Sequence, residues 1–263
     1  MMNDGWSRRM EAASEAARMA GKLLLNGLGE DLGTTSKGRN DFVTVMDVRS
    51  EELIKHHLHT LFPYDNFLGE EMGYEQYGDG GTWIIDPIDG TTNYIHGIPG
   101  YTISIAYEEK KWDPVVGVVY DPVLDELHAA QRNHGAFCNN VSIAVSPVVD
   151  VHQSVVMISP PLRKPERLSD YLGLFADICR NAGEVRDFGS AAGHLCHVAH
   201  GRGEAFIEFG LKYHDIAAGI VILKEAGGEV SSLDLTEKNE WMGNIIASNK
   251  ALHSWFVEHA QFS

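Results

Sequence analysis

Two aspartates lie three residues apart in the segment WIIDPIDGTTN, at Asp86 and Asp89. The apolar residues before Asp86 favour a strand, and Pro87 keeps Asp86 out of helical geometry. Gly90 permits a tight turn, and a helix is expected to begin between Asp89 and Asn93. Carboxylates beside a helix N-terminus can hold hard divalent cations while backbone N–H groups face phosphate oxygens. The segment therefore predicts phosphoryl-transfer chemistry.

Two other carboxylates stand near the ends of expected strands. One strand is predicted to close on Asp47, and a helix is expected to follow over residues 48–61. On the residues alone, an N-cap role is the favoured interpretation of Asp47. Glu70 follows a short predicted strand at 66–68 and precedes a glycine-rich acidic loop. Acidic pairs on loops usually face solvent, but a position shortly before Asp86 favours a functional role for Glu70.

Three sequence blocks carry a family resemblance. They are LGEE at 68–71, DPIDGTTN at 86–93 and YHDIAAG at 213–219. With matches from about residue 37 to 249, the chain resembles the inositol monophosphatase family of magnesium-dependent, lithium-sensitive phosphatases. The resemblance implies two Mg²⁺ ions, with a third, weaker ion near Asp47. The first ion would be held by Glu70, Asp86 and the Ile88 carbonyl, and the second by Asp86, Asp89 and Asp215.

The resemblance also implies how water and substrate are held. Glu70 and the pair Thr91–Asp47 are expected to activate the attacking water, and the backbone N–H groups of Gly90 and Thr91 to receive the phosphate. Without the resemblance, Thr91 would be an ordinary helix-start threonine. Where the family usually has tryptophan, this chain has His214, which bears on substrate preference and pH response. The substrate site implied comprises Ile88, Asp89, Gly90, Thr91, Gly189, Ser190, Ala191, Glu208 and Asp215.

The elements that must position these residues differ between the two halves of the chain. Strands at 101–107, 115–120 and 126–130 predict an antiparallel meander, and a turn is expected at 135–140. From about residue 141, strands alternate with helices, including a helix expected at 216–226. These patterns predict an N-terminal α+β subdomain over 1–141 and a C-terminal α/β subdomain over 142–263. The resemblance implies a layered αβαβα sandwich shared with fructose-1,6-bisphosphatase.

Composition limits the partners and the compartment. The 263 residues carry 37 acidic and 21 basic side chains, for a net charge of −16, which disfavours nucleic acid and anionic membrane surfaces. Three cysteines lie far apart without a CxxC pair, so neither a disulfide framework nor a zinc knot is predicted. No signal or membrane segment is apparent, and a cytoplasmic location is expected. A homodimer is what the resemblance implies.

The leading hypothesis is a Mg²⁺-dependent phosphomonoesterase acting on inositol monophosphate or a related small sugar phosphate. Fructose-1,6-bisphosphate, histidinol phosphate and NADP remain open as substrates, because phosphatases for them share this scaffold. A non-catalytic interaction protein that retains the fold is the alternative of a different class. A GxGxxG dinucleotide motif and a basic stripe are both missing from the sequence.

Overall fold

The computed structural model describes residues 4–29, 33–38, 41–232 and 243–260. Its helices are α1 (Asp4–Gly27), α2 (Val45–Leu61), α3 (Thr91–Ile95), α4 (Leu168–Asn181), α5 (Ala191–Ala199), α6 (Tyr213–Glu225) and α7 (His253–His259), with short 3₁₀ turns at Val151–Gln153 and Pro165–Arg167. Its strands are β1 (Thr35–Gly38), β2 (Asp41–Val43), β3 (Asn66–Gly69), β4 (Gly73–Glu75), β5 (Thr82–Asp89), β6 (Thr102–Lys110), β7 (Asp113–Asp121), β8 (Glu126–Gln131), β9 (Ala136–Cys138), β10 (Val141–Ile143), β11 (Val155–Ile158), β12 (Glu184–Arg186), β13 (Ala205–Glu208), β14 (Gly228–Ser232) and β15 (Ile245–Asn249).

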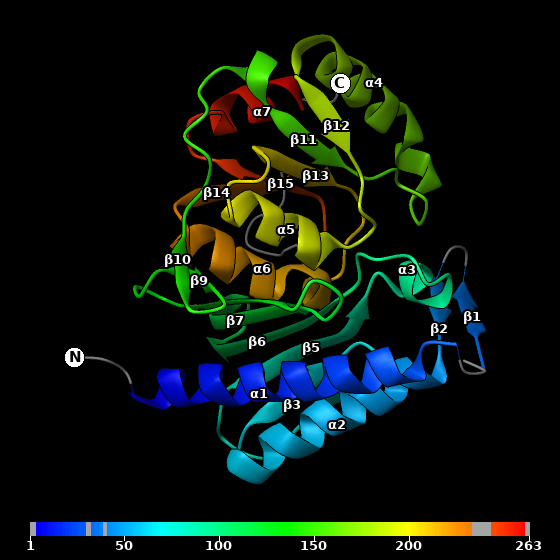
Figure 1. Ribbon diagram of the computed structural model, residues 1–263, viewed down its shortest axis with the longest axis vertical. Coiled ribbons are helices and arrows are strands. Elements are labelled where there is room, and N and C mark those ends of the chain that lie inside the picture. The colour runs from blue at the N-terminus through cyan, green and yellow to red at the C-terminus, as the bar shows by residue number, and fades with distance from the viewer. Residues whose placement is uncertain (1–3, 30–32, 39–40, 233–242, 261–263) are drawn as a thin grey trace.

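The elements stack as helix, sheet, helix, sheet and helix layers (Figure 1). Helices α1 and α2 cover one face of an eight-stranded sheet with the order β10-β9-β8-β7-β6-β5-β3-β4. Helices α5 and α6 separate it from a five-stranded sheet with the order β12-β11-β13-β15-β14, and α4 and α7 lie beyond that sheet. The expected αβαβα sandwich is therefore confirmed. None of the helices in the described ranges combines the length and apolar character needed to cross a bilayer.

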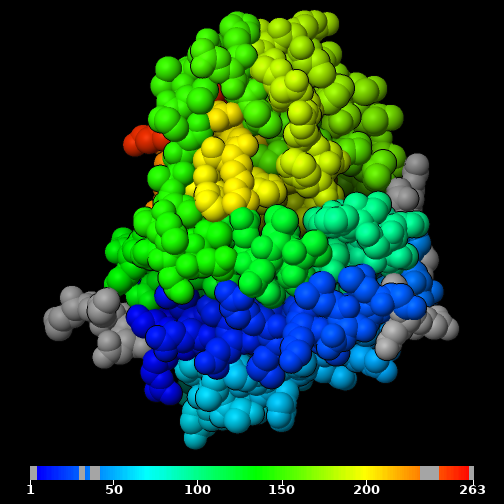
Figure 2. Space-filling view, viewed as in Figure 1, coloured from blue at the N-terminus to red at the C-terminus, as the bar shows by residue number. Residues whose placement is uncertain are grey.

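Small residues let the layers approach closely. The buried face of α1 is mostly alanine, and it packs on the sheet through a core that includes Trp83 and Ile105. On the other face, a Cβ added at Gly117 of β7 would lie 2.3 Å from the carbonyl oxygen of Ala218, so the α6 backbone lies against the sheet. The space-filling view shows the yellow α5 region set between green segments above and below it (Figure 2).

The predicted meander is confirmed as β6, β7 and β8, which pair antiparallel. The prediction of a turn over 135–140 was wrong in part, because Ala136–Cys138 forms β9 and pairs with β8. Ala136 and Cys138 are both buried, and the turn residues lie on either side of this short strand. The division at 141/142 stays a prediction; it falls inside β10, the last strand of the first sheet.

Candidate active site

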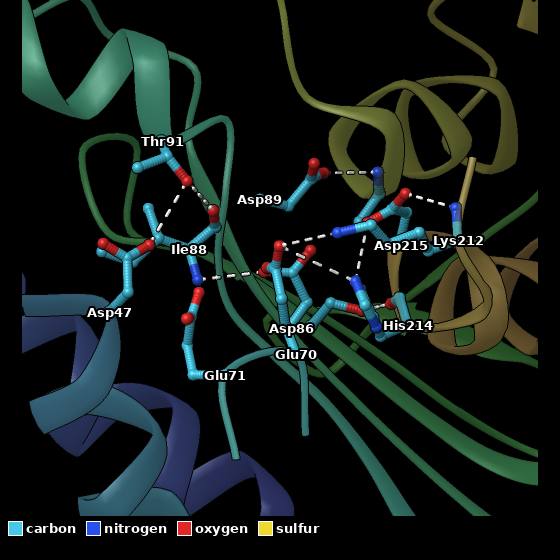
Figure 3. Close-up of polar contacts among 12 residues, drawn as sticks. Asp47, Glu70, Glu71, Asp86, Ile88, Asp89, Thr91, Lys212, His214 and Asp215 are labelled. Carbon is cyan, nitrogen blue, oxygen red and sulfur yellow. Dashed lines mark hydrogen bonds and ion pairs between the residues drawn. The ribbon is translucent and has the colours of Figure 1, made fainter. Parts of the chain in front are cut away.

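Parallel pairing of β3 with β5 places Glu70 close to Asp86. Gly69 stands opposite Ile85, and the Glu70 N–H donates to the Ile85 carbonyl oxygen at 3.1 Å. Because parallel strands present their carboxyl ends at one edge, Glu70 lies level with the aspartate that follows Ile85. Asp86 is 1% exposed. Figure 3 shows the carboxylates of Glu70 and Asp86 directed into the same space.

The segment after Asp86 departs from regular strand geometry. The register of β5 against β6 shifts between Asp86 and Asp89, and Asp86 Oδ1 accepts a hydrogen bond from the Ile88 N–H at 3.1 Å. Gly90 has a φ of +94°, in the left-handed region that favours glycine. This turn ends β5 and starts α3, so both aspartates and the first residues of α3 face one space, as the sequence predicts.

Thr91 and Asp47 are neighbours, as the family resemblance implies. Thr91 Oγ1 lies 2.9 Å from the Ile88 carbonyl oxygen and 3.3 Å from Asp47 Oδ1. A hydroxyl has one proton, so it can donate to only one of these two acceptors at a time. The orientation of the Thr91 hydroxyl therefore depends on whether Asp47 or the Ile88 carbonyl accepts its proton.

Two predictions around Asp47 were wrong: the strand expected to close on Asp47 ends at Val43, and the helix expected to start at residue 48 begins earlier. Helix α2 begins at Val45, with Thr44 as its N-cap, so Asp47 is the third residue of the first turn. Asp47 Oδ2 accepts from both the N–H and the hydroxyl of Thr44, each at 2.7 Å. Asp47 therefore completes a capping box with one oxygen and faces Thr91 with the other. Burial raises the pKa of Asp47 to about 6, although the bonds from Thr44 oppose that rise.

Asp215 reaches the same space from the second half of the chain (Figure 3). The helix expected to start at residue 216 begins at Tyr213, and Asp215 Oδ2 accepts from the Lys212 N–H at 2.7 Å. His214 Nε2 lies 3.4 Å from Asp215 Oδ1 and 3.9 Å from Glu70 Oε1. His214 therefore lies close to carboxylates from both halves of the chain.

Asp89 is held by the start of α5. Its Oδ2 accepts from the Ser190 hydroxyl and from the Ala192 N–H, both at 2.6 Å. The Ser190 oxygen in turn accepts from the Gly193 N–H at 3.0 Å and caps the helix. The sequence predicts the turn at 189–193 as a substrate contact. In the structure, Ser190 donates to the Asp89 carboxylate, and Gly189 and Ala191 line the cavity; the role of this turn as a substrate contact stays a prediction.

The carboxylates strongly perturb one another. Burial, followed by the charges of Glu70, Asp89 and Asp215, raises the pKa of Asp86 well above its usual range. Burial and the charge of Asp215 raise the pKa of Asp89 to about 7. Burial and the charge of Glu70 raise the pKa of Asp215 to about 6. Several buried acids around one space fit divalent cations, which would remove the repulsion that raises these values.

A cavity of about 320 Å³ opens onto these groups. Burial and the charges of Asp215, Asp89 and Asp187 raise the pKa of Glu208 in its wall to about 8. Among the described lining residues, Arg163 is the one with a cationic side chain. The cavity is lined by Phe42, Glu70, Asp86, Ile88, Asp89, Gly90, Thr91, Thr92, Asn93, Ser159, Pro160, Leu162, Arg163, Asp187, Gly189, Ala191, Glu208, Phe209, Gly210, Leu211 and Asp215.

Sequence reasoning missed several residues of this region, among them Asn93 and Arg163. Asn93 Nδ2 donates to the carbonyl oxygens of Gly100 and Phe188, both at 2.7 Å, and so ties the first helix turn after Gly90 to the loop before α5. Arg163 lowers the pKa of Asp215 by its charge, against the larger effect of burial. Asn93 lies inside the motif DPIDGTTN, whereas Arg163 stands in a segment without a recognisable pattern.

Comparisons with known proteins agree with this geometry. The sequence profile of the inositol monophosphatase family matches residues 6–263. The fructose-1,6-bisphosphatase/inositol-1-monophosphatase of Aquifex aeolicus is 38% identical over 254 residues, covering 96% of this chain and 95% of that protein. The Nus factor SuhB of Vibrio cholerae is 36% identical over 245 residues, with 91% of each protein covered.

Solved structures show the same likeness. The crystal structure of the extragenic suppressor protein suhB from Bartonella henselae has a TM-score of 0.91 at 34% identity, covering 97% of this chain and 98% of that one. Profile, curated relatives and fold all extend over nearly the whole length of the sequence. The chain therefore belongs to the inositol monophosphatase family.

Proposed function

We propose that this protein is a Mg²⁺-dependent phosphomonoesterase that hydrolyses inositol monophosphate or a related small sugar phosphate. One observation carries the proposal: carboxylates from separate parts of the chain converge on one cavity and mutually raise their pKa values. A group of acids that repel one another is costly to bury unless cations neutralise it. Membership of a phosphatase family supplies the reaction class.

The donor set suits magnesium. Apart from the ring nitrogen of His214, which is grouped with Glu70 and Asp86, the atoms available are carboxylate and carbonyl oxygens, which hard cations prefer. Glu70, Asp86 and the Ile88 carbonyl would hold one ion, and Asp86, Asp89 and Asp215 a second, with Asp47 near a third. When bound, such ions would acidify the attacking water and stabilise negative charge on the phosphate and on the departing oxygen.

The protein's own groups would position the water and the phosphate. Glu70 is the carboxylate that would take up a proton from the attacking water. The Thr91 hydroxyl would orient that water while donating its own proton to Asp47 Oδ1, 3.3 Å away. If the Ile88 carbonyl oxygen coordinated a cation, Asp47 Oδ1 would remain as the hydrogen-bond acceptor for the Thr91 hydroxyl. Backbone N–H groups at Gly90 and Thr91, which lack partners within α3, would face the phosphate.

The cavity walls favour a neutral polyol as the leaving group. In the metal-free site, burial followed by the charges of Asp215 and Asp89 raises the pKa of Glu208 to about 8, and burial still favours its protonated form when cations neutralise those charges. A protonated carboxyl can both donate to and accept from a ring hydroxyl. The several acids around it disfavour a second anionic group close by. Inositol monophosphate therefore suits the site better than NADP.

A phosphate-release screen with Mg²⁺ tests the assignment. The substrates are inositol-1-phosphate, fructose-1,6-bisphosphate, histidinol phosphate, NADP and 2′-AMP, and the highest kcat/KM is expected for inositol-1-phosphate. Fructose-1,6-bisphosphate is measured over the same concentration range as inositol-1-phosphate, because the Aquifex relative is named for both activities. Highest turnover of NADP or 2′-AMP would refute the preference for a polyol. If none of the five substrates is hydrolysed, the assignment as a phosphatase of this class is refuted.

A non-catalytic interaction role is the second candidate, since several relatives are named Nus factor SuhB. Retention of the whole carboxylate set favours an enzyme, and the net charge of −16 argues against direct contact with nucleic acid. We further propose a cytoplasmic homodimer that is inhibited by lithium. Light scattering on the purified protein tests the dimer.

A further inference from the structure

Four potential metal ligands gather away from the candidate active site. They are Glu126 and His128 on β8, Cys138 on β9, and His200 directly after α5. One ligand atom from each lies within 4.8 Å of the others. None of these residues lines the cavity described above. This group contains a thiol, which the group of Glu70, Asp86 and His214 at the candidate active site lacks.

The strand pairing explains why three of these side chains share one face. His128 and Cys138 stand directly opposite each other in the antiparallel β8–β9 ladder. Residues opposite each other in such a ladder project to the same side of the sheet. Glu126 precedes His128 by two residues, so its side chain projects to that side as well. The end of α5 then brings His200 over this face.

The contact between the two histidines already has the spacing of two ligands on one ion. His128 Nε2 lies 3.2 Å from His200 Nδ1. In a tetrahedral zinc site, bond lengths of about 2.0–2.3 Å place neighbouring ligand atoms about 3.3–3.8 Å apart. A cluster whose ligand atoms all lie within 4.8 Å of one another therefore needs an adjustment of about 1 Å to enclose an ion.

Burial keeps the two imidazoles neutral, whereas it raises the pKa of the Cys138 thiol, so the ion must displace the thiol proton. His128 and Cys138 are 4% and 7% exposed. Burial lowers the pKa of His128 to about 4, and it also lowers the pKa of His200. Both imidazoles are therefore neutral at pH 7, the state in which a ring nitrogen can bind a metal.

Glu126 is oriented by an outer partner. Its two carboxylate oxygens accept from Arg202 Nη1 at 2.6 Å and from Arg202 Nη2 at 2.5 Å. Each carboxylate oxygen keeps a second lone pair. The two hydrogen bonds from Arg202 therefore orient the Glu126 carboxylate and still leave it able to bind an ion. Hydrogen-bonded outer partners of this kind commonly orient metal ligands.

We propose that Cys138, His128, His200 and Glu126 form a structural site for Zn²⁺ or a similar borderline-soft divalent ion. Binding replaces the proton of the Cys138 thiol, which passes to solvent, with a metal–sulfur bond. The ion joins the β8–β9 hairpin to the C-terminal end of α5. The N-terminal end of the same helix donates hydrogen bonds to Asp89 from Ser190 and Ala192. A bound ion would therefore restrict the motion of the helix that positions Asp89 in the candidate active site.

The test uses Co²⁺ as a spectroscopic substitute on the full-length, metal-free protein, with excess Mg²⁺ present to occupy the carboxylate site. We expect one equivalent of Co²⁺ to give a near-ultraviolet thiolate-to-cobalt charge-transfer band, and one equivalent of Zn²⁺ to remove it. Because no described residue of the cavity wall is a cysteine, this band reports only on a thiol site. The band should vanish in Cys138→Ser and persist in the controls Cys179→Ser and Cys196→Ser.

A second pair of variants tests the imidazole ligand. His200→Gln should weaken Zn²⁺ binding at least tenfold, whereas His197→Gln, three residues earlier on α5, should not. Zn²⁺ should also raise the melting temperature of the wild-type protein in excess Mg²⁺, and not that of Cys138→Ser. Circular dichroism confirms that each variant is folded. Absence of the band, its persistence in Cys138→Ser, or equal loss in Cys196→Ser would overturn the proposal.

Discussion

Asp215→Asn should stabilise the metal-free protein at alkaline pH while it impairs catalysis. Asp215 is 5% exposed, and burial followed by the charge of Glu70 raises its pKa from 3.8 to about 6. Between these two values the folded state binds more protons than the unfolded state, so folding stability falls as pH rises through this window. Asparagine does not ionise, and its carbonyl oxygen can still accept from the Lys212 N–H.

The size of the effect follows from the pKa shift. A shift of about 2 units corresponds to about 3 kcal/mol of stability, lost by the wild-type protein as Asp215 ionises. The variant avoids this loss. Its unfolding free energy relative to wild type should therefore rise by about 2 kcal/mol between pH 4 and pH 8, and by about 3 kcal/mol over the whole titration. For a chain of this size, that corresponds to a gain of about 6–12 °C in melting temperature.

Thermal and urea unfolding in EDTA, repeated at several pH values, measure this difference. Asp177→Asn is the matched control, because Asp177 lies on α4 with a side chain that is 44% exposed. Adding saturating Mg²⁺ at pH 8 should reverse the order of stability, since the wild-type site then gains more from the ion. A difference between variant and wild type that does not change with pH, or an unchanged order with Mg²⁺, would refute the reasoning.

Other predictions concern the turn and its hydroxyl. Asp86→Asn should abolish Mg²⁺-dependent phosphate release without changing the circular dichroism spectrum; normal turnover would remove the metal assignment. Thr91→Val should lower kcat by about 10²–10⁴, whereas Thr91→Ser should keep most of it, as steady-state kinetics can show. Gly90→Ala should lower stability by about 1–3 kcal/mol in urea unfolding, because φ is +94° and the new Cβ would lie 3.0 Å from two carbonyl oxygens. Millimolar lithium should inhibit turnover, and an indifferent rate would argue against the inositol-type assignment.

Much of the first sheet could be predicted because its strands are continuous apolar runs bounded by turns. The short strand β9 could not. Only three residues long, it lies between Gly135 and the Asn139–Asn140 pair, so turn composition dominates any local window. Its pairing with β8 is a tertiary effect, and it is this pairing that brings Cys138 opposite His128. Widely spaced cysteines in the sequence gave no sign of that neighbourhood.

The family motifs located the site residues, whereas their supporting contacts depend on the fold. The bond from Ser190 to Asp89 spans 101 positions, and that from Asn93 to Phe188 spans 95. Contacts of this range leave no periodicity in the sequence. The motifs indicate which residues supply the carboxylates, whereas only the three-dimensional arrangement shows which contacts orient them.

The two misplaced helix starts share one physical cause. Asp47 and Asp215 each occupy the third position of a helix, and the Oδ2 of each accepts a hydrogen bond from the backbone N–H three residues earlier, at 2.7 Å. This capping bond points Oδ1 of Asp47 towards Thr91, and Oδ1 of Asp215 lies 3.4 Å from His214. The local bond that starts the helix thus also aims the carboxylate. Asparagine at either position keeps the cap and loses the charge, whereas alanine loses both, so comparing the two substitutions separates helix stability from site chemistry.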